Sequence, residues 1–131
     1  MARKMSEAQH QAAVIKWTQQ PGIRQQWPEL ALLHHIPNGG TRDPVEAKHL
    51  KQQGVKNGVP DLCLPVPHGR YHGLYIEMKR EDGAPSEDQK WWGEKLQSYG
   101  YAWSVCHGYE EAISTLQWYL AMPASGLRET L

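Results

Sequence analysis

Apolar residues near the start of the chain recur with the spacing of an α-helix. Ala8, Ala12 and Ile15 follow one another at intervals of four and three residues, which places them on one helix face. Ser6 stands just before this pattern, and Gln9 stands at the third helical position. This pair has the form of a capping box, in which each side chain binds the backbone N–H of the other residue. The sequence therefore predicts an amphipathic helix that begins after Ser6.

Further helices are predicted from their start and stop signals. Asp43 is followed by a proline, which suits the first helical position because its missing N–H would have no partner there. Ser86 and Gln89 form a second capping box. A last helix is expected over residues 109–121, and the Pro-Gly pair at 21–22 is expected to end the first one.

Short apolar runs between these helices predict four strands, over residues 30–36, 61–66, 74–79 and 101–106. The alternation of helices and strands predicts an α/β fold, with a mixed central sheet flanked by helices. The chain has 131 residues, which suits one domain. We expect its core to span about residues 6–121 and residues 122–131 to form a frayed tail.

Composition narrows the classes of protein that the chain can belong to. No apolar run approaches the roughly 18 residues that span a bilayer, and the start lacks the apolar stretch of a signal peptide. We therefore expect a cytoplasmic protein without a membrane partner. Cys63 and Cys106 lie in apolar segments and are expected to be buried free thiols. Seven histidines without metal-ligand spacing do not indicate a zinc site.

The segment between the second and third predicted strands is rich in Pro and Gly, which favours an antiparallel hairpin. If Gly69 lies at the middle of the turn, Asp61 stands opposite Glu77 and Cys63 stands opposite Tyr75. Because side chains alternate between the faces of a strand, Asp61, Glu77 and Lys79 then share one face. The other face is apolar and carries Leu62, Leu64, Leu74, Ile76 and Met78.

Two carboxylates on one cross-strand pair repel each other unless a cation lies between them. Asp61 and Glu77, completed by water and phosphate oxygens, suit Mg²⁺, which rarely occupies a site made only of protein ligands. Lys79 on the same face is placed to orient or help deprotonate a water molecule and to stabilise charge on a phosphate. From these residues alone, a solvated strand edge without function is an equally good interpretation.

The order of motifs resembles that of a known nuclease family. It resembles the PD-(D/E)XK nuclease superfamily and, within it, the VRR-NUC family of virus-type replication-repair nucleases. The resemblance covers about residues 6–105. The segments that carry it are Glu7 with Gln11, Pro37-Asn38-Gly39, Gly54 to Asp61, Tyr75-Ile76-Glu77-Met78-Lys79, and Ser86 with Gln89.

The resemblance implies roles that the spacing alone does not. It implies that Asp61, Glu77 and the backbone carbonyl of Met78 bind Mg²⁺ or Mn²⁺, and that Lys79 is the catalytic lysine. It also implies that Glu7 reaches the metal directly or through water, and that Gln89 lies near the metal or its nucleophile. For Gln89 simple capping is the alternative, and for Glu7 it is a favourable charge in the first turn of a helix.

Net charge is zero, with 14 Lys and Arg against 14 Asp and Glu, so a DNA partner would depend on how the basic residues cluster. Two groups of basic residues and one Gly-rich loop are candidates for contacts with DNA: Arg42, Lys48, Lys51 and Lys56; Arg80 and Lys90; and Asn38 with the glycines after it. Trp91 is expected to be partly buried, whereas an exposed Trp91 would indicate a dimer interface or base stacking.

The leading hypothesis is a metal-dependent DNA endonuclease that acts as a homodimer on branched DNA, such as four-way (Holliday) junctions in DNA repair. This substrate rests on the resemblance, and a dimer would place two sites to cut two strands symmetrically. The alternatives are a DNA end-processing or restriction-like nuclease, a DNA-binding module without catalysis, and a metal-dependent hydrolase of small molecules.

Overall fold

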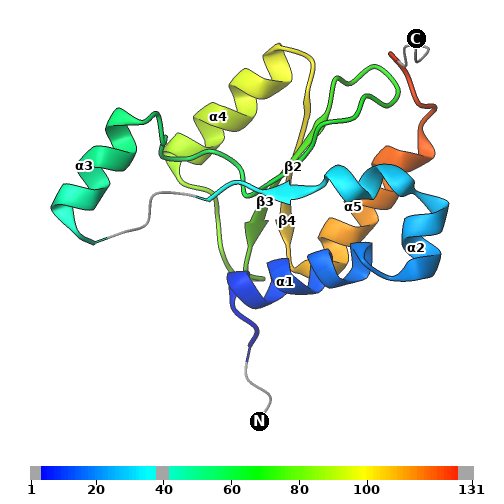
Figure 1. The fold of residues 1–131 in the computed structure, drawn as a ribbon, viewed down its shortest axis with the longest axis horizontal. Coiled ribbons are helices and arrows are strands. Elements are labelled where there is room, and N and C mark those ends of the chain that lie inside the picture. Colours follow the sequence, from blue (N-terminus) through cyan, green and yellow to red (C-terminus); the bar gives the residue numbers. More distant parts are fainter. Residues whose placement is uncertain (1–3, 38–41, 127–131) are drawn as a thin grey trace.

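A four-stranded sheet forms the centre of the protein, with strands in the order β1-β2-β3-β4 (Figure 1). The structure, a computed structural model, describes residues 4–37 and 42–126. The strands are β1 (His34–His35), β2 (Leu62–Leu64), β3 (Leu74–Lys79) and β4 (Ala102–His107). The first two pairings are antiparallel and the β3–β4 pairing is parallel. Helices flank this mixed sheet, so the predicted α/β class is confirmed.

The helices begin where the sequence predicts them. Ser6 and Ser86 each accept a hydrogen bond from the backbone N–H three residues later, and both capping boxes are complete. Asp43 accepts from the N–H of Val45. The helices are α1 (Glu7–Thr18), α2 (Pro21–Gln26), the 3₁₀ helix η1 (Pro28–Leu32), α3 (Pro44–Gln52), α4 (Glu87–Ser98) and α5 (Tyr109–Ala121).

One local prediction is wrong and one helix was not predicted, and a proline begins the element in each case. Pro21 follows the end of α1 as predicted, but it also begins α2, because proline suits the first position of a helix. The predicted strand over 30–36 is a 3₁₀ helix from Pro28, followed by a strand of only two residues. Periodicity cannot separate a short buried helix from a strand, and the buried Leu30 satisfies either interpretation.

The predicted hairpin register is confirmed. Cys63 pairs with Tyr75, and Leu62 pairs with Ile76, so the same register places Asp61 beside Glu77 just beyond the end of β2. The apolar face of the hairpin is covered by α1 and α5, and it contributes to the core the fully buried side chains of Leu62, Leu64, Leu74, Ile76 and Met78. Alternation therefore puts Glu77 and Lys79 on the opposite face of the sheet, as expected.

Helix α4 packs on β4, where Gly93 meets the ring of Trp103. A Cβ atom on Gly93 would come within 2.2 Å of that indole. Trp103 pairs with Tyr75 across the sheet, so it lies on the same face as Glu77. The helix and its glycine thus cover the sheet face that carries the polar residues.

Residues 122–126, expected to belong to a frayed tail, are hydrogen-bonded to the loop of the hairpin. The ring Nδ1 of His68 lies 2.7 Å from the carbonyl oxygen of Met122, and the N–H of Gly69 donates to Pro123 at 2.8 Å. Ser125 donates in turn to the carbonyl of Pro67. The rest of the expected tail, residues 127–131, lies outside the described residues.

Cys63 and Cys106 are buried free cysteines, as predicted. Within residues 4–37 and 42–126, no helix is both long enough and apolar enough to span a membrane.

Candidate active site

Asp61 is held in place through its backbone. It follows Pro60, which is fully buried, and its carbonyl oxygen accepts hydrogen bonds from the N–H of Ile36 at 2.7 Å and from Nδ1 of His35 at 2.8 Å. His35 lies in β1, and Ile36 directly follows it. The short strand β1 therefore fixes the position from which the Asp61 side chain extends.

The Asp61 carboxylate reaches across the hairpin to β3. Its Oδ2 atom accepts a hydrogen bond of 2.8 Å from the backbone N–H of Met78. In an extended strand the N–H and C=O of one residue point to the same edge. The Met78 carbonyl is thus directed to the edge of β3 on which Asp61 lies, and its role as a metal ligand stays a prediction.

Glu77 is a buried carboxyl group without a full set of partners. Its exposed fraction is 1%, and Oε2 has no hydrogen-bond partner. Burial, and after it the nearby Asp61 carboxylate, raise the pKa of Glu77 to about 8, because the opposing effect of the Lys79 ammonium is smaller than either. At neutral pH the group therefore holds a proton unless a cation takes its place.

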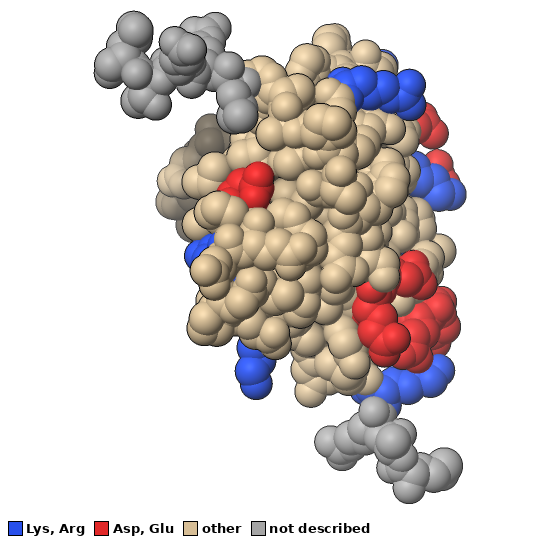
Figure 2. Space-filling model, turned by 90° about the vertical axis from the view of Figure 1, so that its right-hand side faces the viewer, with Lys and Arg blue, Asp and Glu red and all other residues tan. Residues whose placement is uncertain are grey.

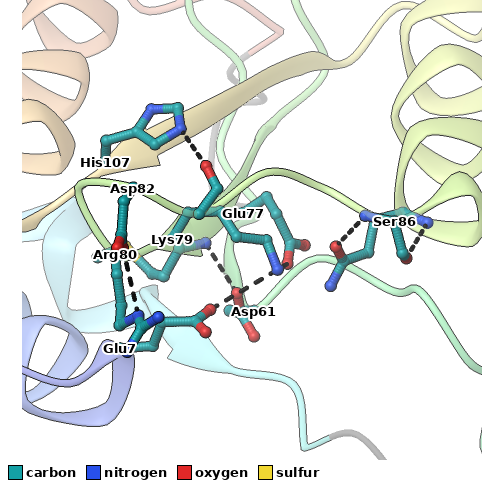
Figure 3. Close-up of polar contacts among 11 residues, drawn as sticks. Glu7, Asp61, Glu77, Lys79, Arg80, Asp82, Ser86 and His107 are labelled. Carbon is teal, nitrogen blue, oxygen red and sulfur yellow. Dashed lines mark hydrogen bonds and ion pairs between the residues drawn. The ribbon is translucent and has the colours of Figure 1, made fainter.

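Lys79 lies between two carboxylates. Its Nζ atom is 3.7 Å from Oε1 of Glu77 and 3.7 Å from Oε1 of Glu7, and its side chain is largely buried (Figure 3). Glu7 comes from the first turn of α1, far from β3 in the sequence. The structure thus brings together Asp61, Glu77, Met78, Lys79 and Glu7, as the sequence analysis expected.

The residues present fit a hard divalent cation bound by few protein ligands. Within residues 4–37 and 42–126, no three His, Cys, Asp or Glu side chains form a ready-made cage. Mg²⁺ commonly takes one or two carboxylates and keeps several waters. Asp61, Glu77 and the Met78 carbonyl supply oxygen donors of this kind, and the unpartnered Oε2 of Glu77 is the atom that a cation would satisfy.

The side chain of Gln89 is engaged in the capping box at the start of α4. Its Oε1 atom accepts a hydrogen bond of 2.8 Å from the N–H of Ser86 (Figure 3), and its own N–H donates to the Ser86 hydroxyl. This is the capping alternative. A role for Gln89 at the reacting atoms stays a prediction, and it would need the side chain to leave the capping box.

The basic residues proposed to contact DNA lie in two places. Arg80 pairs with Asp82 at 3.5 Å and Lys90 pairs with Glu87 at 3.3 Å, so these two are engaged in local ion pairs near the site. The others are exposed on or beside α3, which stands apart from the sheet in Figure 1: Arg42, Lys48, Lys51 and Lys56. Asn38 lies outside the described residues.

Two histidines support the site through backbone contacts that the sequence did not reveal. His35 donates to the Asp61 carbonyl, as described above. His107, at the end of β4, has its Nε2 atom 2.9 Å from the carbonyl oxygen of Gly83, in the turn that follows Lys79 (Figure 3). Their partners are main-chain atoms distant in the sequence, so no motif or spacing could have identified these roles.

Two comparisons with known proteins show which family the chain belongs to. The family model described as the VRR-NUC domain matches residues 5–110. A solved structure described as "VRR_NUC domain protein" is similar over 98% of this chain and 100% of its own, with a TM-score of 0.79 and 30% sequence identity. No curated protein matches. The family match covers most of the chain and includes Glu7, Asp61, Glu77 and Lys79, so the chain belongs to the VRR-NUC family and has its nuclease-type fold.

Proposed function

We propose that this protein is a Mg²⁺- or Mn²⁺-dependent endonuclease that hydrolyses phosphodiester bonds in DNA. The observation that carries the proposal is the buried Glu77 carboxyl group, with one oxygen unpartnered, beside the Asp61 carboxylate and the Lys79 ammonium. Burying such a group costs stability, and carboxyl groups with a strongly perturbed pKa cluster at functional sites, so this arrangement favours a role in binding a cation.

The side chains have distinct tasks in this proposal. Asp61, held by the Met78 N–H, and Glu77 provide oxygen ligands for a metal ion, which when bound neutralises charge on the scissile phosphate and activates water. Lys79 offsets the additional negative charge that the phosphate gains when water attacks in line. Glu7 orients the Lys79 ammonium from the other side. Water adds to phosphorus, one P–O ester bond breaks, and the leaving oxygen takes up a proton.

The proposed substrate is branched DNA such as a four-way junction, cut by a homodimer. Figure 2 shows a broad face with few Lys, Arg, Asp or Glu side chains, on the side where α2 lies in Figure 1. Depletion of charge is typical of the core of a protein interface, whereas DNA contacts need basic residues. A second copy on this face would leave α3 and the site free for DNA, and its two-fold symmetry would match two symmetric cuts.

A cleavage panel tests the proposal. Purified protein would be incubated with linear duplex, flapped and four-way DNA, each with Mg²⁺, Mn²⁺ or a chelator. We expect cleavage only with a metal ion and fastest on the junction, and its loss in Asp61→Ala and Lys79→Ala. Glu94→Ala removes a carboxylate that is exposed on α4, and it serves as the control that keeps activity.

The outcomes separate the alternatives. Equal cleavage rates on all DNA forms would exclude a preference for the junction and would indicate a restriction-like nuclease. Cleavage confined to free ends would indicate end processing. Retention of DNA without cleavage in the wild-type protein would indicate a binding module. Failure to retain any DNA at low salt would indicate a small-molecule hydrolase. Sedimentation at equilibrium would measure the oligomeric state, and a monomer at micromolar concentration would contradict the dimer.

A further inference from the structure

Trp91 on α4 is exposed, contrary to the expectation that a neighbouring element covers it. Its exposed fraction is 55%, and Tyr99 at the end of the same helix is 74% exposed. Trp92 beside it is anchored, because its Nε1–H donates to the carbonyl of Asn57 at 3.0 Å. The two indoles meet nearly at right angles, with ring centroids 5.9 Å apart. An anchored indole thus supports an exposed one.

These aromatic rings line a pocket of about 600 Å³, which we call the α4 pocket. This volume lies within the range of about 300–1,000 Å³ that is typical of small-molecule sites. Its lining includes Lys56, Asp88, Trp91, Lys95 and Tyr99. Flat aromatic surfaces of this kind stack well with a planar ring.

The charges around the α4 pocket suit one nucleotide better than a phosphate group alone. Lys56 and Lys95 both line it, and Nζ of Lys95 lies 5.9 Å from the centroid of the Trp91 ring. Both lysines can neutralise the phosphates on either side of a bound base. Asp88 also lines the pocket. A carboxylate repels phosphate but accepts hydrogen bonds from the N–H groups on the edge of a base.

The α4 pocket is joined to the candidate active site by the loop that leads to Asp61. Asn57, which binds Trp92, is followed by Gly58, and a Cβ atom on Gly58 would lie 2.7 Å from the backbone of Asp88. Gly58 has a φ of +88°, a conformation that favours glycine. The loop is therefore packed against the first turn of α4, so that the pocket and Asp61 hold a fixed relation to each other.

We propose that the α4 pocket binds an unpaired base of the DNA substrate, stacked on Trp91 and Tyr99, with Lys56 and Lys95 on the flanking phosphates. The proposal rests on the proposed function, which it deepens by naming the part of the substrate that is recognised. A base that is already unpaired binds without the cost of being taken out of a duplex. The pocket therefore favours branched DNA with unpaired nucleotides at the branch point, and a fully paired four-way junction would fill it only by opening a base pair there.

Binding measured without metal tests the pocket separately from catalysis. The probes are a fluorescent oligothymidylate of about 12 nucleotides, a length within the site sizes of single-strand binding proteins, and an abasic strand of equal length. Anisotropy in a chelator gives the affinity for each. We expect Trp91→Ala to weaken binding of the oligothymidylate about 5- to 100-fold, as the loss of one stacked base would. Binding of the abasic strand should change little, and Trp91→Phe should retain most of the affinity.

Trp118 on α5 offers a matched control, since it is 51% exposed and lies outside the α4 pocket. Trp118→Ala should leave both affinities unchanged, and circular dichroism should show that every variant is folded. Equal binding of the two strands by wild type, or equal losses in Trp91→Ala and Trp118→Ala, would overturn the proposal. The proposal would also be overturned if Trp91→Ala dissociated a wild-type dimer and weakened binding of the oligothymidylate and of the abasic strand equally. A protein that binds bases at Trp91 but never cleaves DNA would refute the proposed function and leave the pocket intact.

Discussion

At the scale of single residues, the environment of Glu77 changes the protonation of its carboxyl group. An ordinary glutamate is ionised at neutral pH, but here burial and the Asp61 carboxylate favour the protonated form. The two carboxyls can share that proton, which relieves their repulsion in the absence of a cation. A divalent cation bound at the same place, as proposed, would compete with the proton, so that metal binding and proton release would be coupled at this residue.

The raised pKa of Glu77 predicts a pH-dependent stability for the metal-free protein. The unfolded chain loses this proton near pH 4.5, whereas the folded protein keeps it to about pH 8. The folded state therefore binds more protons between these values, and its stability falls as the pH rises through this window. Urea unfolding in a chelator should show this decline in wild type and a smaller one in Glu77→Gln.

Glu87→Gln, at an exposed position of α4, is the control and should follow the wild-type pH profile. Identical slopes for wild type and Glu77→Gln would contradict a raised pKa at this residue.

Lys79 is predicted to act through the position of its charge. Lys79→Ala should lower the cleavage rate by about 10²–10³-fold, which is the usual cost of removing a group that stabilises a transition state. Lys79→Arg keeps the charge but has a larger, planar head between Glu7 and Glu77, only 3.7 Å from each partner in the native protein. We expect it to recover a small part of the rate, measured under single-turnover conditions at saturating metal.

Unchanged metal affinity by isothermal calorimetry would show that Lys79→Ala affects the reaction and not the binding of the ion. A rate within twofold of wild type would exclude Lys79 from the chemistry.

At the scale of secondary structure elements, the sequence predicts those features that depend on residues close to one another along the chain. Ser6, Asp43 and Ser86 predict the starts of helices because a cap binds the backbone N–H groups of its own first turn. Asp61, Glu77 and Lys79 could be assigned to one face because strand alternation and a Pro/Gly-rich turn fix the hairpin. Glu7 could be placed there only by resemblance to a family, since nothing in local spacing joins α1 to β3.

What the sequence could not predict depends on tertiary context. The form of residues 28–36 is decided by the docking of Leu30 in the core and by the pairing of His34–His35 with β2. The protonation of Glu77 depends on the depth of its burial, which is set by the elements packed around β3. The exposure of Trp91 depends on where other elements lie, and helical periodicity does not contain that information.

The contact between α4 and β4 gives a prediction at this scale. A methyl group on Gly93 would come within 2.2 Å of the Trp103 ring, so Gly93→Ala must displace α4 from the sheet. We expect a loss of about 1–3 kcal/mol in the free energy of unfolding, the usual cost of overpacking, although alanine is the better helix former. Chemical denaturation monitored by tryptophan fluorescence would measure it.

Gly22→Ala in α2 is the matched control, because nothing lies within 4 Å of the added carbon. It should leave the stability unchanged or raise it slightly. Equal stabilities for the two variants would show that α4 does not pack closely on Trp103.

At the scale of the whole molecule, His68 joins three distant parts of the chain. The residue lies in the hairpin loop and is 4% exposed. Its Nδ1 atom contacts the Met122 carbonyl after α5, and its Nε2 atom lies 3.3 Å from a carboxylate oxygen of Glu29 in η1. The end of the last helix and the 3₁₀ helix are thus both held at the hairpin that carries the site.

His68→Ala should therefore destabilise the whole fold. We expect a loss of about 1–3 kcal/mol, because the partly buried Met122 carbonyl loses its partner. His49→Ala, at an exposed position of α3, is the control and should change the stability by less than about 0.5 kcal/mol. Equal unfolding midpoints for both variants would show that His68 does not link these segments.

Helix α3 stands apart from the sheet and none of its residues is buried (Figure 1). Its sequence is therefore not constrained by the core, and its composition and even its length can change without a large cost in stability. The hairpin that carries Asp61 and Glu77 has no such freedom, because its register fixes both the core and the site. Change during evolution can thus accumulate on α3 while the hairpin is preserved. In protein engineering, the DNA contacts proposed for α3 make it the element to exchange when the preference for DNA is to change and the hairpin is to be kept.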